Sequence, residues 1–254
     1  MKIFVAGGTG VIGRRLVPLL VTSGLDVTAV ARSENKARAL TEQGARAVRV
    51  DIFDADAVER AVKGHDVVIN MATRIPPSSK VFFPGSFNEN NRIRQYASRN
   101  LSQAAMKAGA ERFIQESFSA AYPDCGDEWI EETVSLEPAK YVRTVLDAER
   151  AAFDFTRGGG VGVVLRFSFF YGPDSDMTRD IVKFVRKGIA PALGHPDGYM
   201  SSIWLDDAAS AVVASLRVPA GAYNVTDDEP VTRRAAFDAL AATIGVKAPK
   251  MLPA

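Results

Sequence analysis

The chain has 254 residues, of which 47% are hydrophobic and 24% charged. Lys and Arg number 31 against 30 Asp and Glu, which gives a formal net charge of +1. A chain of this length buries well over half of its unfolded surface, so the composition predicts a folded globular protein. The balanced charge provides neither a basic stripe for nucleic acid nor a polybasic segment for an anionic membrane surface. We therefore expect no nucleic-acid partner and no membrane partner.

Reactive side chains are scarce. Cys125 is the only cysteine, and His65 and His195 are the only histidines. A lone cysteine cannot form an internal disulfide, and two isolated histidines hold a metal only with help from several carboxylates. We expect no metal site, and the composition disfavours a Ser-His-Asp hydrolase almost as strongly.

The apolar stretches are short. The uncharged stretch from Leu16 to Leu25 has ten residues, whereas a membrane-spanning helix needs about 20. The opening segment MKIFVAGGTG reaches glycine after four apolar residues, which is typical of a strand and a turn and not of a signal peptide. These features predict a cytoplasmic protein.

The first two thirds of the chain alternate short apolar runs with helical patterns. Nearly continuous runs of Val, Ile and Phe between helices indicate parallel βαβ units, so we expect a doubly wound α/β fold with a parallel sheet covered on both faces. The runs are Ile3 to Ala6, Val27 to Ala31, Ala47 to Asp51, Val67 to Met71, Phe113 to Ser117 and Val161 to Phe167. The predicted helices are Val11 to Thr22, Asn35 to Gln43, Asp54 to Lys63, Arg94 to Ala108 and Pro138 to Arg157.

This alternation breaks after Phe167. The pattern then predicts a strand and helix over 201–215, a strand near 222–225 and a helix over 232–243. We assign residues 1–167 plus 197–216 to a nucleotide-binding domain, and 168–196 plus 217–254 to a small substrate-binding cap. No repeat or low-complexity segment is visible.

A glycine-rich turn follows the first predicted strand. It reads Gly7-Gly8-Thr9-Gly10-Val11-Ile12-Gly13 and opens a helix. Glycine suits position 7 for a tight turn, position 10 for a close approach to a pyrophosphate, and position 13 for close helix packing, while the helix N-terminus faces the phosphate charge. Alone this spacing is weak evidence, but a strand before it and βα units after it favour a dinucleotide-binding Rossmann fold over a plain strand-to-helix turn.

The end of the second strand indicates which dinucleotide binds. An NAD site usually has Asp or Glu there, whereas the 2′-phosphate of NADP calls for Arg. The sequence has Arg32, then Ser33, and Lys36 one helical turn later, so NADP(H) is favoured; the alternative is that these are solvated surface charges. Asp51 is placed to accept from the adenine amino group, unless it is an ordinary acid before a helix, a role that Asp54 can fill. The cofactor contacts that we expect are Gly7, Thr9, Gly10, Val11, Ile12, Gly13, Arg32, Ser33, Lys36, Asp51, Ile52, Met71, Ala72, Thr73, Phe167 and Ser168.

Together these motifs resemble the extended and atypical short-chain dehydrogenase/reductases, the superfamily of NAD(P)-dependent sugar epimerases and dehydratases. The resemblance implies a tyrosine at the start of the fifth helix, a lysine four residues later and a Ser or Thr near the end of the fifth strand, which transfer protons beside the nicotinamide. The matching segments are AGGTGVIG at 6–13, VDIFD at 50–54, VVINMAT at 67–73, RFIQESFSAAYP at 112–123, VLRFSFFYGP at 164–173, SIWLDDAASAV at 202–212 and GAYNVTDDEPVT at 221–232.

The catalytic set implied by this resemblance is incomplete. Tyr141 takes the tyrosine position, but the lysine position is Val145, and the usual hydroxyl position falls on Phe118, with Ser117 and Ser119 on either side of it. On a continuous helix, residues 141 and 145 share a face, which Lys140 and Arg143 do not. The helix-four asparagine that often supports the lysine falls on Arg94. These departures predict a redesigned or lost reductase mechanism.

Three hypotheses remain for the function. The first is an NADP(H)-dependent reductase of a small apolar carbonyl, with Tyr141 as proton donor and Ser117 orienting the substrate carbonyl. A tyrosine without a nearby cation keeps its proton at neutral pH, so it is a better donor than acceptor. The second is a nucleotide-binding sensor or partner-binding protein whose catalytic site has decayed. The third is an epimerase or lyase that uses acids such as Glu116, although an ion pair with Arg94 explains that buried acid more simply.

The substrate walls are expected in three places. A long loop from Phe118 to Glu137 is expected to cover the substrate side of the nicotinamide. The stretch from Pro76 to Phe87, with Phe82, and the cluster from Phe167 to Tyr171 add aromatic walls, unless these aromatics form the core of the cap. The sequence leaves open whether the protein is a monomer or a homodimer, and whether the cap, which ends at Ala254, is shortened or trimmed.

Overall fold

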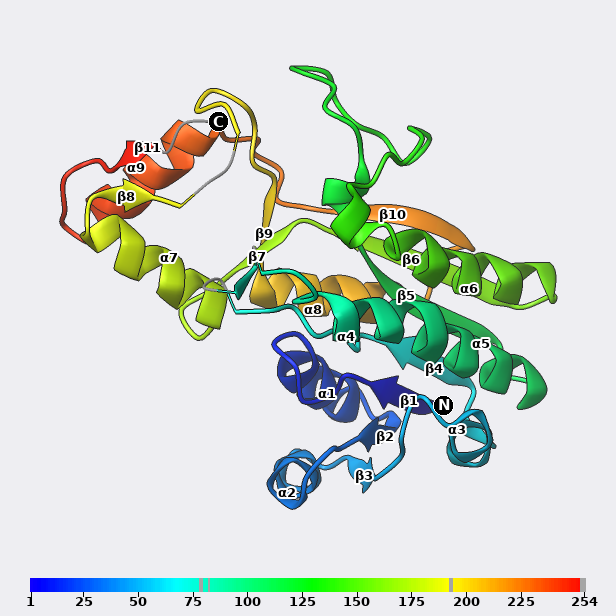
Figure 1. The fold of residues 1–254 in the computed structure, drawn as a ribbon. Coiled ribbons are helices and arrows are strands. Elements are labelled where there is room, and N and C mark those ends of the chain that lie inside the picture. Colours follow the sequence, from blue (N-terminus) through cyan, green and yellow to red (C-terminus); the bar gives the residue numbers. More distant parts are fainter. Residues whose placement is uncertain (78–79, 82, 192–193, 252–254) are drawn as a thin grey trace.

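The computed structural model describes residues 1–77, 80–81, 83–191 and 194–251. Seven parallel strands form one sheet in the order β10-β6-β5-β4-β1-β2-β3 (Figure 1). The chain enters at the centre and winds outward in both directions, so the predicted doubly wound fold is confirmed. The strands are β1 (Lys2–Ala6), β2 (Asp26–Val30), β3 (Arg46–Val48), β4 (Val67–Asn70), β5 (Arg112–Phe118), β6 (Val161–Phe167) and β10 (Gly221–Val225).

Helices cover both faces of this sheet and enclose two apolar cores. On one face, Leu16, Val17 and Leu20 form the buried stripe of the first helix, as expected of an amphipathic helix. On the other face, the strand residues Phe4 and Phe113 pack against helices from the middle of the chain. The first face is covered by α1 (Gly13–Thr22), α2 (Glu34–Glu42) and α8 (Leu205–Ala214), and the second by α3 (Ala55–Val62), α5 (Ser98–Lys107) and α6 (Val145–Arg157).

The cap has a small core of its own. Val185 of α7 (Asp176–Arg186) packs with Ala190, Phe237 and Ala241. Phe237 and Ala241 belong to α9 (Arg233–Thr243), and β8 (Ile189–Ala190) pairs with β11 (Lys250–Met251). A second small sheet joins β7 (Phe169–Tyr171) to β9 (Ser202–Trp204). Figure 1 shows α7, α9 and these short strands at one side of the main sheet.

Two sequence-based boundaries need correction. The strand near Ala222 to Val225, which we assigned to the cap, is β10, and it pairs with β6 at the edge of the main sheet. The helix expected from Pro138 begins only at Val145. Before it, a short 3-10 helix, η4 (Lys140–Val142), is followed by a bond from the Leu146 amide to the Arg143 carbonyl at 3.1 Å, a tighter winding than an α-helix.

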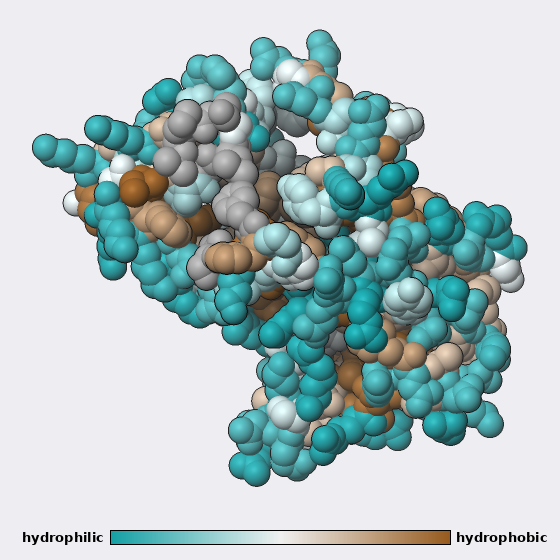
Figure 2. Space-filling view, in the orientation of Figure 1, coloured by the Kyte–Doolittle hydropathy of each residue, from teal (hydrophilic) through white to brown (hydrophobic). Residues whose placement is uncertain are grey.

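The surface is mainly hydrophilic on the face drawn in Figure 2, where apolar residues show only as small separate patches. Within the described part of the chain, no helix is both long and apolar enough to cross a membrane.

Candidate cofactor and active site

The glycine-rich turn lies at the carboxyl edge of the sheet, between β1 and α1. Gly7 has a positive φ of 86°, and a Cβ there would lie 2.4 Å from the carbonyl carbon of Met71. A Cβ on Gly13 would lie 2.2 Å from the Gly7 carbonyl oxygen. Real Cβ atoms do not tolerate such distances, so both positions require glycine. The turn therefore presses its backbone against the end of β4.

The residues that follow β4 are fixed by a buried amide. The Asn70 Oδ1 atom accepts a hydrogen bond from the Ala72 amide at 3.1 Å, and its Nδ2 donates to Gln115 at 2.9 Å. Asn70 is completely buried, so its side chain holds the backbone of Met71 and Ala72 beside the turn. Thr73 follows and is half-buried. The structure thus brings together two predicted contact segments, 7–13 and 71–73, whose nearest residues, Gly13 and Met71, are 58 positions apart in sequence.

The other predicted contacts around this edge differ in exposure. Ile12 is buried in the core, Thr9 and Val11 are half-buried, and Gly10 is exposed. Asp51 is exposed, and its side chain accepts a hydrogen bond from the Phe53 amide at 3.0 Å. Asp54 caps α3 by accepting from the Ala57 amide, so Asp51 does not serve as the cap, and its contact with adenine stays a prediction. The Ile52 carbonyl accepts from Asn100 at 3.1 Å.

Three cations meet beyond the end of β2. Arg32 follows β2, and its guanidinium lies 3.7 Å from Glu89. Arg74 follows β4, and its guanidinium lies 3.6 Å from the other oxygen of the same carboxylate. Partial burial, and then the positive charges of Arg32 and Arg74, lower the pKa of Lys36. Ser33 takes the cap position of α2 but makes no capping hydrogen bond.

Sequence reasoning finds Arg32 and Lys36 but misses Arg74 and Glu89. Arg74 lies on the connection after β4 and Glu89 in the short helix that follows it, and only the sheet order, with β1 alone between β4 and β2, shows that these residues reach the end of β2. The signal available in the sequence is that parallel strands end at one edge, so a basic residue soon after β4 is a candidate neighbour.

This edge fits a phosphate-bearing dinucleotide. The glycine turn would hold the pyrophosphate on backbone amides at the start of α1, and the cations around Arg32 would hold a further phosphate. Cations held close together favour an anionic ligand; partial burial lowers the pKa of Lys36, and the positive charges of Arg32 and Arg74 lower it further.

Tyr141 lies on a separate turn from α6. It is on the one-turn helix η4, and 58% of its surface is exposed, whereas Val145, the first residue of α6, is fully buried. The expectation that positions 141 and 145 share one helical face is therefore wrong. The Tyr141 ring packs against Phe87 with centroids 5.4 Å apart, and the Thr144 hydroxyl donates to Asn91 at 2.8 Å.

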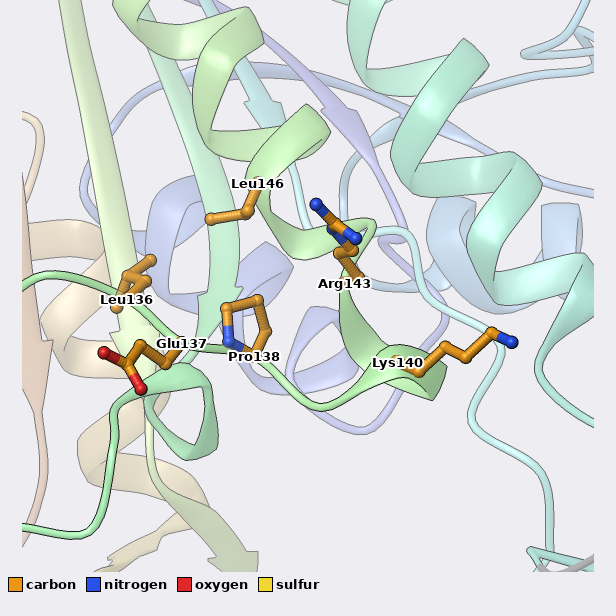
Figure 3. Close-up of a pocket in the computed structure, with 6 residues that line it drawn as sticks. All are labelled: Leu136, Glu137, Pro138, Lys140, Arg143 and Leu146. Carbon is orange, nitrogen blue, oxygen red and sulfur yellow. The ribbon is translucent and has the colours of Figure 1, made fainter.

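The cations next to Tyr141 in sequence line an open groove. Its volume is about 460 Å³, and its lining consists of Leu136, Glu137, Pro138, Lys140, Arg143 and Leu146. In Figure 3 the Lys140 side chain extends away from the Glu137 side of the groove, and Arg143 lies near Leu146. Since Val145 is buried and these cations face the groove, none of them stands at the position of the family lysine.

Ser117 belongs to a buried polar network. It is fully buried, and its hydroxyl donates to Glu149 at 2.6 Å. Glu149 also receives two hydrogen bonds from Arg166, each at 2.9 Å. Burial opposes the charge of Arg166, but its hydrogen bonds to Glu149 and Tyr122 outweigh that effect and raise the pKa of Arg166. This placement does not support direct contact of Ser117 with a substrate.

Glu116 forms an ion pair with Arg94 at 3.2 Å, and both side chains are buried. This is the simpler explanation that the sequence offered for Glu116. Arg94 lies on a short π-helix, η2 (Ile93–Ala97), which links α4 (Asn88–Arg92) to α5; such local widening often accompanies function. Burial raises the pKa of Glu116 although Arg94 opposes the shift. One oxygen of Glu116 and the Arg94 Nε have no hydrogen-bond partner among the described residues.

Comparison with known proteins matches residues 3–226 to the model of the NAD dependent epimerase/dehydratase family. The chain belongs to this family. It is therefore an NAD(P)-dependent enzyme, as the glycine turn and the resemblance to extended short-chain dehydrogenase/reductases predicted.

Two curated members resemble the chain over nearly its whole length. A 3-diazoavenalumate denitrifying reductase of Streptomyces sp. is 33% identical over 275 aligned residues, which cover 100% of this chain and 85% of that protein. A 4-hydroxy-2-methyl-3-oxo-4-farnesyl-3,4-dihydroquinoline-1-oxide ketoreductase of Stigmatella aurantiaca is 26% identical and covers 98% of this chain and 75% of that protein.

Solved structures of the family share the fold. The UDP-glucose 4-epimerase of Thermus thermophilus, solved with NAD, has a TM-score of 0.81 and 26% identity, and covers 100% of this chain and 86% of that one. The UDP-glucose 4-epimerase of Thermotoga maritima, at 21% identity and a TM-score of 0.82, supports the fold alone.

The aromatic residues after β6 divide between core and surface. Phe167 is fully buried and Phe170 packs partly against the same core, whereas Phe169 and Tyr171 are exposed. Phe169 contacts Phe118 edge-on with centroids 5.3 Å apart. Ser168 is buried, and its hydroxyl is 3.3 Å from that of Ser119. In this family member only part of the predicted aromatic wall can face a substrate; Phe82 lies outside the described residues.

Proposed function

We propose that this enzyme is an NADP(H)-dependent reductase of a small apolar carbonyl compound, with Tyr141 as proton donor. One observation carries the cofactor choice, namely that Arg32, Lys36 and Arg74 converge at the end of β2. An NAD site usually has an acid directly after this strand, where the chain has Arg32. A 2′-phosphate would relieve the repulsion among the three cations.

The chemistry assigned to this chain is the transfer of one proton. Bound NADPH supplies the hydride, and the protein supplies position and electrostatics. Tyr141 is exposed, so its hydroxyl can reach a carbonyl oxygen, and its ring is held against Phe87. Without a lysine at position 145, Tyr141 is suited to give a proton during reduction more than to accept one during oxidation.

The role of orienting the substrate moves from Ser117 to Ser119. The Ser117 hydroxyl is committed to Glu149 in the interior. Ser119 is half-buried, and its hydroxyl lies 3.3 Å from Ser168, the last residue of the predicted cofactor set. We propose that Ser117 helps to hold Glu149 in the interior, and that Ser119 donates the hydrogen bond to the substrate carbonyl.

The substrate class follows from the exposed aromatic side chains. Phe169 and Tyr171 project from β7 on the same side, since successive strand residues alternate. They contact Phe118 and Trp204, respectively, with ring centroids 5.3 Å apart in each pair. Such a surface suits an apolar or aromatic carbonyl better than a polyhydroxylated sugar, and the two curated relatives named above are reductases by name.

Direct binding tests the cofactor choice. We expect NADPH to bind at least about tenfold more tightly than NADH, since a hydrogen bond to a charged group contributes about 1.5–3 kcal/mol. The double variant Arg32→Ala/Arg74→Ala should lose most of that preference and leave NADH affinity unchanged. Arg38→Ala, which removes an exposed arginine of α2, is the control. Equal affinity of the wild-type protein for both cofactors, measured by titration calorimetry, would refute the assignment.

The epimerase and sensor alternatives are separated by turnover. Cofactor consumption with aldehydes, ketones or quinones supports the reductase. Conversion of a substrate without net cofactor consumption would favour an epimerase. Tight cofactor binding with no turnover would favour a sensor, an alternative that the buried Val145 supports because it stands at the position of the family lysine.

A further inference from the structure

An acid stands between the two arginines of the cation cluster. The two carboxylate oxygens of Glu89 lie 3.7 Å from Arg32 and 3.6 Å from Arg74. All three side chains are about half exposed, so each pair is open to water and to competition by another anion. Glu89 thus occupies the position between the guanidinium groups that a phosphate bound by both arginines would take.

The backbone next to Glu89 is attached to the same site. The Arg74 amide donates a hydrogen bond to Asn90 Oδ1 at 2.9 Å, and Asn90 is buried. Glu89 therefore reaches the arginines from an anchored helix, α4, and not from a freely moving loop.

We propose that Glu89 is a specificity-determining residue that competes with the 2′-phosphate of NADP(H) for Arg32 and Arg74. The inference rests on the proposed cofactor choice and goes beyond it. In the free protein Glu89 neutralises part of the cluster; when a 2′-phosphate binds, the carboxylate leaves the arginines. A cofactor without this phosphate leaves Glu89 in place.

The release of Glu89 from the arginines also affects the turn that carries Tyr141. Phe87, directly before α4, packs against the Tyr141 ring with centroids 5.4 Å apart. Asn91, in the same helix, accepts a hydrogen bond from the Thr144 hydroxyl at 2.8 Å. The short segment from Phe87 to Asn91 therefore contacts the phosphate-binding arginines and the catalytic tyrosine. Cofactor phosphate and the position of Tyr141 are coupled through it.

The first test uses adenosine 2′,5′-bisphosphate and adenosine 5′-monophosphate as probes, which differ only in the 2′-phosphate. In Glu89→Gln we expect the bisphosphate to bind about 3- to 10-fold more tightly than in the wild type, as the loss of exposed competing ion pairs allows. Binding of the monophosphate should change by less than about twofold. Titration calorimetry at low and high salt measures both, and the gain should shrink at high salt.

The matched control is Glu34→Gln. It removes the same charge two residues from Arg32, yet within the described chain Glu34 forms no ion pair with either arginine. An equal gain in Glu34→Gln would reduce the effect to general charge and overturn the proposal, as would unchanged or weaker bisphosphate binding in Glu89→Gln. If the wild type does not distinguish the two probes, the cofactor assignment itself fails; if it does and Glu89→Gln adds nothing, only the competition fails.

Amide hydrogen exchange tests the coupling without any turnover. In the wild type, adenosine 2′,5′-bisphosphate should change exchange in the turn at residues 139–144, and the monophosphate should not. In Glu89→Gln this turn should already exchange, before any probe is added, at the rate of the wild type with bisphosphate. An unchanged turn in the wild type with saturating bisphosphate would refute the coupling.

Discussion

The two halves of the carboxyl edge are built on different principles. Around β1, β2 and β4, the site consists of backbone geometry, with glycines that admit no Cβ and with exposed cations close by. Around β5 and β6, it consists of buried side chains joined in ion pairs, Arg94 with Glu116 and Arg166 with Glu149. The first half follows the family pattern, whereas the second lacks the family lysine.

This difference indicates which part of the site tolerates change. A backbone turn against β4 leaves no freedom at Gly7 or Gly13, because any side chain would overlap main-chain atoms. A proton-transfer site depends instead on a few groups, whose pKa values and positions can be set by different neighbours. The half around β1, β2 and β4 therefore has little room to vary, whereas the half around β5 and β6 can vary more freely.

The largest effect is expected from replacing Tyr141, the proposed proton donor. With Tyr141 as proton donor, Tyr141→Phe should lower kcat by about 10²- to 10⁴-fold while the dissociation constant of NADPH stays the same. The measurement is steady-state reduction of the best carbonyl found in a panel of aldehydes, ketones and quinones. Tyr96→Phe, another exposed tyrosine, which lies on the π-helix, is the control. Wild-type turnover in Tyr141→Phe would show that Tyr141 is not the proton donor.

A large loss of stability is expected from the buried network. Arg166→Leu removes the bidentate partner of Glu149 and should lower the free energy of unfolding by about 3–5 kcal/mol, because it leaves a buried carboxylate uncompensated. The double variant Glu149→Leu/Arg166→Leu removes both charges and should be clearly more stable than Arg166→Leu alone. Urea unfolding measures both, and a double variant no more stable than the single one would show that packing, not charge, dominates.

The fold could be predicted from the sequence because its signals are local. Runs such as Ile3 to Ala6 coincide with strands, since a strand covered on both faces is mainly apolar. The pattern predicts the helix from Pro138 too early, because the tighter winding around Arg143 leaves no mark in the hydrophobic pattern. It places the β10 residues in the cap, because their pairing with β6 connects residues about 60 apart in sequence.

The sequence predicts the site only where the residues concerned lie in one continuous segment. The glycine turn and Arg32 each lie within a single βα unit, so spacing reveals them. Arg74 and Glu89 join Arg32 through the sheet order, and Glu149 reaches Ser117 from another element. Ser117 carries a hydroxyl and lies next to the position that the family pattern implies. Strand alternation points this hydroxyl into the interior, where it donates a hydrogen bond to Glu149.

The smallest expected effect is the pH dependence of the buried pair of Glu116 and Arg94. Burial raises the pKa of Glu116 above its ordinary value of 4.5 even though Arg94 lies beside it. A raised pKa means that the folded protein holds this proton more tightly than the unfolded chain does. The stability that Glu116 contributes is therefore fully present below pH 4.5 and is lost as the pH rises through the raised value.

Comparing the unfolding free energies of the wild type and Glu116→Gln isolates the contribution of Glu116. We expect the difference in unfolding free energy between the wild type and Glu116→Gln to fall as pH rises, by at most about 1.4 kcal/mol per pH unit. Arg94→Leu removes the charge that opposes the shift, so in its background the fall should extend to higher pH. A difference that grows with pH would mean that Arg94 outweighs burial and would contradict the prediction. The fall predicted here would instead show that burial, and not Arg94, decides the direction in which the pKa of Glu116 moves.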